Sequence, residues 1–171
     1  MGLIISKLLF SYGYFEMKAK LPKGKWLWPA IWLSNFKTWP PEIDILEGYS
    51  RKGNYENSAN FKNFKLQPNI HYGHDFDGSK TSYGAKSHPI FNAIDKEITY
   101  GLIWEKNAIK IYYDGYKVFQ TSDDKILKYF NIEENKMEII LNNGLESKVK
   151  NEKLQSSVFK IKSVKYYKLI F

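Results

Sequence analysis

Three carboxylates lie within six residues in the segment WPPEIDILEGY, namely Glu42, Asp44 and Glu47. In a β-strand alternate side chains share a face, so Glu42 and Asp44 would point the same way and Glu47 the other. The residues between the acids are apolar and favour burial. A one-residue bulge at Ile45-Leu46 would return Glu47 to the face of the other two acids. We therefore expect a bulged strand with three acids on one side.

Three acids on one face indicate a specific kind of chemistry. Like charges raise the pKa of at least one carboxyl. A retaining glycosidase needs one ionised carboxylate as nucleophile and one protonated carboxyl as acid, about 5–5.5 Å apart. With the bulge, Glu42 and Glu47 would be about 13 Å apart at Cα, and their side chains could close that gap by leaning inward. Asp44 would tune both. The alternative is an acidic, exposed strand edge.

Aromatic residues surround the acidic segment. Four tryptophans precede the acids, and aromatic rings offer an apolar platform to the C–H faces of sugars. Trp39 stands beside two prolines directly before the acids, so a sugar contact is expected there. Trp32 lies in an apolar run, which favours a place in the core. Core packing is the alternative for every tryptophan.

The composition excludes several classes of protein. The chain of 171 residues suits one domain. It has no cysteine, which rules out disulfides and thiolate chemistry. No apolar run approaches the ~20 residues needed to span a bilayer. The net charge of +8 comes almost wholly from lysine, with Arg51 the single arginine, so nucleic-acid binding is disfavoured. Such a basic surface would suit an acidic polysaccharide.

Alternation with a period of two dominates the chain and predicts an antiparallel all-β sandwich or barrel. Residues 123–129 are the one expected helix, and residues 1–10 are expected to form a strand that enters the core. Residues 50–96 hold looser strand pieces and the expected binding loops. The other expected strands cover residues 14–21, 26–34, 43–49, 98–104, 109–113, 116–121, 137–141 and 158–171. Asp114-Gly115 favours a type I′ hairpin, and a shift of the apolar phase near Ser163 indicates a bulge in the last strand.

Two blocks of sequence resemble glycoside hydrolase family 16. They are SYGYFEMKAKLPKGKWLWPAIWL (residues 11–33) and PEIDILEGY (residues 41–49). The acids match the longer E-x-D-x-x-E form of the family motif, which is similar to that of laminarinases and marine galactanases. Weaker resemblance continues through YGLIW, YYDGY and the final SVKYYKLIF, so it spans most of the chain.

The resemblance implies a β-jelly-roll sandwich with a concave cleft for an extended glycan, formed by a single catalytic domain over residues 1–171. It implies that Glu42 is the nucleophile, Glu47 the acid/base and Asp44 an assisting carboxylate. Trp28, Trp39 and Asn142 match positions near the family's cleft. The implied substrate is β-1,3- or β-1,3-1,4-glucan. A sulfated galactan and a non-catalytic glycan-binding role are the alternatives.

The chain also departs from the family pattern. The strands that normally precede the first block are missing, so the domain is expected to be N-terminally truncated, and Ile98 replaces a frequent histidine. His71 could hydrogen-bond a sugar or be structural. No cofactor or metal site is expected, because no histidine pair has zinc spacing and residues 75–78 lack the glutamate of a calcium loop. We expect a monomer that acts outside the cell on a polysaccharide, without nucleic-acid or membrane partners.

Overall fold

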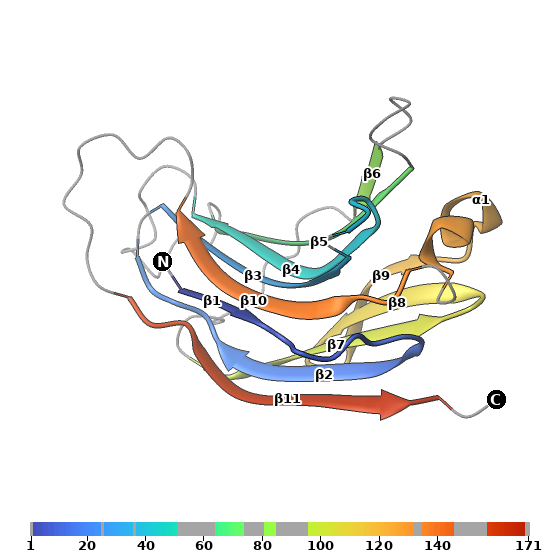
Figure 1. Ribbon diagram of the computed structural model, residues 1–171. Coiled ribbons are helices and arrows are strands. Elements are labelled where there is room, and N and C mark those ends of the chain that lie inside the picture. The colour runs from blue at the N-terminus through green and yellow to red at the C-terminus, as the bar shows by residue number, and fades with distance from the viewer. Residues whose placement is uncertain are drawn as a thin grey trace.

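The computed structural model describes residues 2–24, 26–35, 37–50, 64–73, 81–84, 96–131, 135–145 and 157–169. These residues form two antiparallel sheets packed against each other, as Figure 1 shows. The result is the all-β jelly-roll sandwich expected from the alternation and the resemblance. The segment 75–78, most of the strand piece expected at 58–64 and most of the expected binding loops lie outside the described residues.

The six-stranded sheet carries the acidic segment and has the order β1-β10-β3-β4-β5-β6. Its strands are β1 (Gly2–Ile5), β10 (Glu138–Leu145), β3 (Leu27–Ser34), β4 (Glu42–Ser50), β5 (Phe64–Tyr72) and β6 (Thr81–Gly84). The strands are bent, so that the face turned away from the other sheet is concave (Figure 1).

The five-stranded sheet supports the first and has the order β11-β2-β7-β8-β9. Its strands are β11 (Lys160–Lys168), β2 (Gly13–Lys20), β7 (Ile98–Glu105), β8 (Ala108–Tyr113) and β9 (Tyr116–Thr121). A short helix, α1 (Asp124–Leu127), follows β9 and continues as the 3-10 helix η3 (Lys128–Phe130), where the sequence predicts a helix.

Alternating side chains build the core between the sheets. Phe15, Met17 and Ala19 of β2 are fully buried, while the residues between them are partly exposed. Ile31 and Leu33 of β3 meet them from the other sheet as members of the same core cluster. Burying such side chains stabilises the fold by roughly 1.5–3 kcal/mol each.

Two local irregularities confirm expectations from the sequence. Asp114 and Gly115, between β8 and β9, both have positive φ, of 46° and 82°. Positive φ at both central residues is the geometry of the type I′ hairpin that Asp-Gly favours. In β11 the register shifts between Ile161 and Ser163, where the apolar phase of the sequence changes.

The expectation that the N-terminal residues enter the core is wrong. β1 is the edge strand of its sheet and pairs only with β10 among the described strands. Its side chains are exposed: Leu3 by 60%, Ile4 by 61% and Ile5 by 42%. The apolar composition of this segment predicts a strand correctly, but an edge position leaves such a strand uncovered. No helix among the described residues is long and apolar enough to cross a bilayer.

Candidate active site

A break in the regular pairing of β4 places the three acids on one face. Between Asp44 and Glu47 the register shifts against both neighbouring strands. Ile45 and Leu46 are fully buried, whereas Glu42 and Glu47 are partly exposed. The irregularity lies where the sequence predicts a bulge, and it lets consecutive apolar residues enter the core while the acids stay on the outer face.

A buried tyrosine from the second sheet supports this irregular segment. The Tyr113 hydroxyl donates a hydrogen bond of 2.9 Å to the carbonyl oxygen of Ile45. Burial raises the pKa of Tyr113 well above its usual range, so the hydroxyl stays protonated and remains a donor. A backbone carbonyl left outside the ladder by a bulge thus finds a partner in the core.

Two indole N–H groups hold the outer carboxylates. Trp28 Nε1 donates to Glu47 Oε1 at 3.2 Å, and Trp39 Nε1 donates to Glu42 Oε2 at 2.8 Å. Charge-assisted bonds of this kind are stronger than neutral ones and fix the carboxylate rotamer. The two tryptophans that the sequence predicts to lie near the glycan therefore also orient the acids.

The central acid is the most deeply buried of the three. Asp44 is only 2% exposed, and its Oδ2 makes no hydrogen bond among the described residues. Burial raises the pKa of Asp44 well above its usual range, and the negative charges of Glu47 and Glu42 raise it further. A proton on Asp44 relieves the repulsion between the three carboxylates.

His71 reaches the acids from β5, where it lies directly opposite Glu42 in the ladder. Its Nε2 atom is 3.4 Å from Glu42 Oε1 and 3.4 Å from Asp44 Oδ2. The ring centroid of Trp39 is 6.0 Å from that of His71. The histidine named from the sequence is therefore part of the acidic cluster, and together with Glu42 and Asp44 it presents three atoms that could hold a metal ion.

Trp32 does not occupy the core position expected for it. It is partly exposed, and its Nε1 donates to Asn142 Oδ1 at 2.7 Å. Trp32 also lies opposite Asp44 in the ladder, on the acidic face. The even spacing from Trp28 to Trp32 along a strand was the signal for a shared face. Asn142, predicted as a glycan contact, holds an indole ring of this face in place.

Sequence reasoning missed two polar residues of β5. Asn69 lies opposite Asp44 and Gln67 opposite Glu47. The Asn69 side-chain nitrogen is 3.1 Å from Nε2 of His71. Their alternate spacing with His71 places all three on one face, but only the pairing of β5 with β4 shows that they border the acids.

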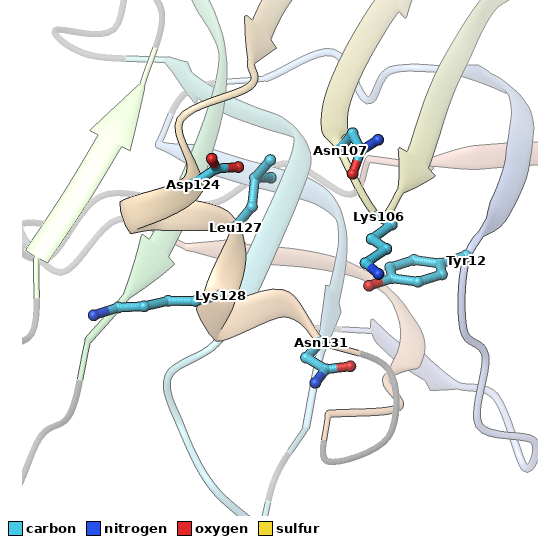
Figure 2. A pocket seen from close by; sticks show the side chains of 7 residues that line it. All are labelled: Tyr12, Lys106, Asn107, Asp124, Leu127, Lys128 and Asn131. Atoms are coloured by element: carbon cyan, nitrogen blue, oxygen red, sulfur yellow. The ribbon is translucent and has the colours of Figure 1, made fainter.

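A separate pocket lies at the end of the sandwich near α1 (Figure 2). Its volume is about 480 Å³. Its lining comes from the segment before β2, the turn between β7 and β8, α1 and η3: Tyr12, Lys106, Asn107, Asp124, Leu127, Lys128 and Asn131. None of the seven site residues predicted from the sequence lines it, so it is distinct from the acidic face.

A jelly roll with paired, oriented carboxylates on an aromatic face defines the class of carbohydrate-active β-sandwiches. The model of the family described as "Glycosyl hydrolases family 16" matches residues 1–160, and the chain belongs to this family.

The chain is also similar to individual named proteins. Glucan endo-1,3-beta-glucosidase A1 of Niallia circulans is 32% identical over 66% of this chain, and a beta-1,3-glucan-binding protein of Penaeus monodon is 31% identical over 64%. The matches span only 16% and 31% of those two proteins. A Bacteroides ovatus family 16 protein, solved in complex with a G4G4G3G product, is 27% identical with a TM-score of 0.74, covering 98% of this chain and 74% of that one.

Proposed function

We propose that this chain hydrolyses internal linkages of a β-1,3- or mixed-linked β-1,3-1,4-glucan and retains the anomeric configuration. The observation that carries the proposal is the irregular strand β4, whose shifted register presents Glu42 and Glu47 on one face with an indole donor on each. The Niallia and Bacteroides relatives support a glucan as the substrate.

In the first step Glu42 attacks the anomeric carbon while Glu47 protonates the leaving oxygen. Trp39 Nε1 donates to Oε2 of Glu42, so the other carboxylate oxygen, Oε1, faces His71 and Asp44 and not the indole. The bond between the sugar and the leaving oxygen breaks as the ester bond to Glu42 forms. In the second step Glu47, now ionised, takes a proton from water, which hydrolyses the ester.

Asp44 assists by holding a proton next to the nucleophile. A protonated Asp44 donates to Glu42 and stabilises its negative charge before attack. When Glu42 becomes an ester its charge disappears, and the pKa of Asp44 falls accordingly. The central acid thus compensates for the change of charge at its neighbour without contacting the leaving group.

Aromatic rings on the same face supply the glycan platform. Trp28 and Trp32 are partly exposed on β3, and Trp39 is 38% exposed before β4. Each apolar ring face suits the C–H face of a glucose unit. All groups in this mechanism come from one chain, so we expect the monomer to be active. We expect it to act on polymers outside the cell.

The test is release of reducing ends from a panel of laminarin, lichenan, agarose, carrageenan and xyloglucan, with Glu42→Gln as the control. We expect release from laminarin or lichenan and none from the control. Proton NMR of the first product distinguishes retention from inversion. Release by wild-type protein and control alike would contradict the role of Glu42, and release from carrageenan alone would favour a sulfated galactan.

A non-catalytic glucan-binding role is the second candidate, supported by the beta-1,3-glucan-binding relative. A binding module would retain laminarin in affinity electrophoresis without releasing reducing ends. Glu42→Gln would then leave binding unchanged, and no polymer of the panel would be cut by the folded wild-type protein.

A further inference from the structure

Three donor atoms from two neighbouring strands converge at the centre of the acidic face. Glu42, Asp44 and His71 each offer one ligand atom, and these atoms lie within 4.8 Å of one another. The atoms in contact are Nε2 of His71 with Oε1 of Glu42 and with Oδ2 of Asp44. We propose that these atoms bind a divalent transition-metal ion of the zinc class, and that the bound ion reversibly blocks the acidic face.

Two of the three separations between the ligand atoms match a tetrahedral site. Zn²⁺ binds imidazole nitrogen and carboxylate oxygen at about 2.0–2.2 Å, so two ligand atoms of one tetrahedron lie about 3.4 Å apart. His71 Nε2 is 3.4 Å from both Glu42 Oε1 and Asp44 Oδ2. An ion bound by these three atoms would keep a fourth position open to water or a sugar hydroxyl.

The buried oxygen of Asp44 is an independent indication of a ligand. Asp44 is 2% exposed, and Oδ2 makes no hydrogen bond among the described residues although it faces the histidine. Buried polar atoms in native proteins are almost always satisfied. A metal ion at the centre of the cluster would satisfy this oxygen and neutralise the repulsion between the two carboxylates.

Two surrounding side chains contact the ligands, and one of them, Trp39, already orients its ligand. Trp39 donates to Glu42 Oε2, which leaves Oε1 facing the cluster. The Asn69 amide nitrogen lies 3.1 Å from His71 Nε2. An amide nitrogen only donates, so this contact uses the same Nε2 lone pair that an ion would bind, and it must break when the ion enters. Hydrogen bonds to a ligating carboxylate, such as the one from Trp39, commonly raise metal affinity.

The donor set decides which ions fit. One imidazole and two carboxylates suit Zn²⁺, Co²⁺, Ni²⁺ or Cu²⁺. Ca²⁺ requires six or more oxygen ligands, and Mg²⁺ keeps most of its water. We therefore expect neither Ca²⁺ nor Mg²⁺ to compete at this site. Inhibition of hydrolysis by the bound ion rests on the proposed function, because the ion occupies the lone pair with which Glu42 would attack; binding itself does not rest on it.

The experiment is calorimetric titration of the chelator-treated, dialysed full chain with ZnCl₂, together with visible absorption of the Co²⁺ form. We expect one ion per chain and the strong absorption of four-coordinate Co²⁺. His71→Asn and Asp44→Asn should each weaken binding by at least about tenfold. Glu47→Gln is the matched control: it removes an acid of the same strand and face that is not a ligand, so binding should persist.

Two results would overturn the proposal: no saturable binding of Zn²⁺ by the wild-type protein, or equal affinity of the wild-type protein and the folded His71→Asn variant. Because binding is measured without substrate, the two proposals fail separately. If the protein binds Zn²⁺ but cuts no polymer, the metal site is supported and the proposed hydrolase activity is rejected. If the protein cuts glucan but neither binds Zn²⁺ nor is inhibited by it, the hydrolase activity is supported and the metal site is rejected.

Discussion

At the scale of single residues, two indoles and a buried aspartic acid give the three acids different environments. Glu42 and Glu47 each accept an N–H from a tryptophan, whereas Asp44 is enclosed between them. Because their environments differ, three carboxyl groups can take the different roles of nucleophile, general acid and protonated assisting group. The roles can therefore be tested one residue at a time.

Glu42→Gln and Glu47→Gln should each abolish polysaccharide hydrolysis and leave the melting temperature nearly unchanged, since both side chains are partly exposed. They should differ on an aryl glycoside whose leaving group needs no proton. Glu47→Gln should still release the aryl group in a first turnover, while Glu42→Gln should not. Stopped-flow absorbance measures the burst of released aryl group. A burst from Glu42→Gln but not from Glu47→Gln would show that Glu47 is the nucleophile and Glu42 the acid/base.

The raised pKa of Asp44 makes stability depend on pH. The folded state binds the proton more tightly than the unfolded chain, so folding loses stability as pH rises from the ordinary aspartate pKa, about 3.9, to the raised value. Each unit of difference corresponds to about 1.4 kcal/mol. Asp44→Asn, which cannot ionise, should lack this loss.

Urea unfolding of both proteins at a series of pH values provides the measurement. The free energy of unfolding of wild-type protein relative to Asp44→Asn should fall with rising pH and become constant above the raised pKa. A difference that stays constant from acid to neutral pH would show that Asp44 titrates normally in the fold.

At the scale of elements, the irregular strand β4 and its support from β8 position the site. The Tyr113 hydroxyl bonds the Ile45 carbonyl at the irregularity, which separates Glu47 from the other two acids. A side chain of the second sheet therefore influences the geometry of the outer face of the first.

Tyr113→Phe should lower the free energy of unfolding by about 1–3 kcal/mol, because the buried carbonyl loses its partner. It should also lower kcat more than it raises KM, since the spacing of the acids changes while the aromatic platform stays. Tyr166→Phe is a matched control, because it removes another hydroxyl-to-backbone bond, to Tyr12. Equal effects of both variants on kcat would argue against a role of the irregularity.

Local patterns in the sequence predicted most strands, the Asp-Gly hairpin and the irregularity of β4, because alternation and turn chemistry are properties of neighbouring residues. The same patterns wrongly predicted Trp32 to lie in the core, and they did not indicate that His71 contacts Glu42. Both facts depend on which strand pairs with which and in what register, and residues far apart in the chain decide that. The acids were predictable because they share one strand.

At the scale of the whole molecule, an exposed apolar edge coexists with a strong positive charge. The edge consists of β1 and the turn after it, where Leu3, Ile4, Leu8 and Leu9 are 52–68% exposed. Uncovered apolar edge strands favour pairing with another chain. The net charge of +8 opposes such contact at low salt.

Ile4→Lys should therefore reduce association at high concentration, and association of the wild-type protein should increase with salt as repulsion is screened. The free energy of unfolding should change by no more than about 0.5 kcal/mol, because the side chain is exposed. Sedimentation velocity at several concentrations measures this. Tyr116→Lys, on a residue 79% exposed at a distant hairpin, is the control and should not change the profile.

The indole contacts with Glu42 and Glu47 also give the protein its own optical probe. Tryptophan emission responds to the electric field along the ring, and a carboxylate at 2.8 Å from Trp39 Nε1 is a strong local source of field. Loss of that charge, by ester formation on Glu42 or by a change in protonation, would shift the emission of Trp39. Chemical events at the two acids would thus be followed as spectral changes in real time, without a label.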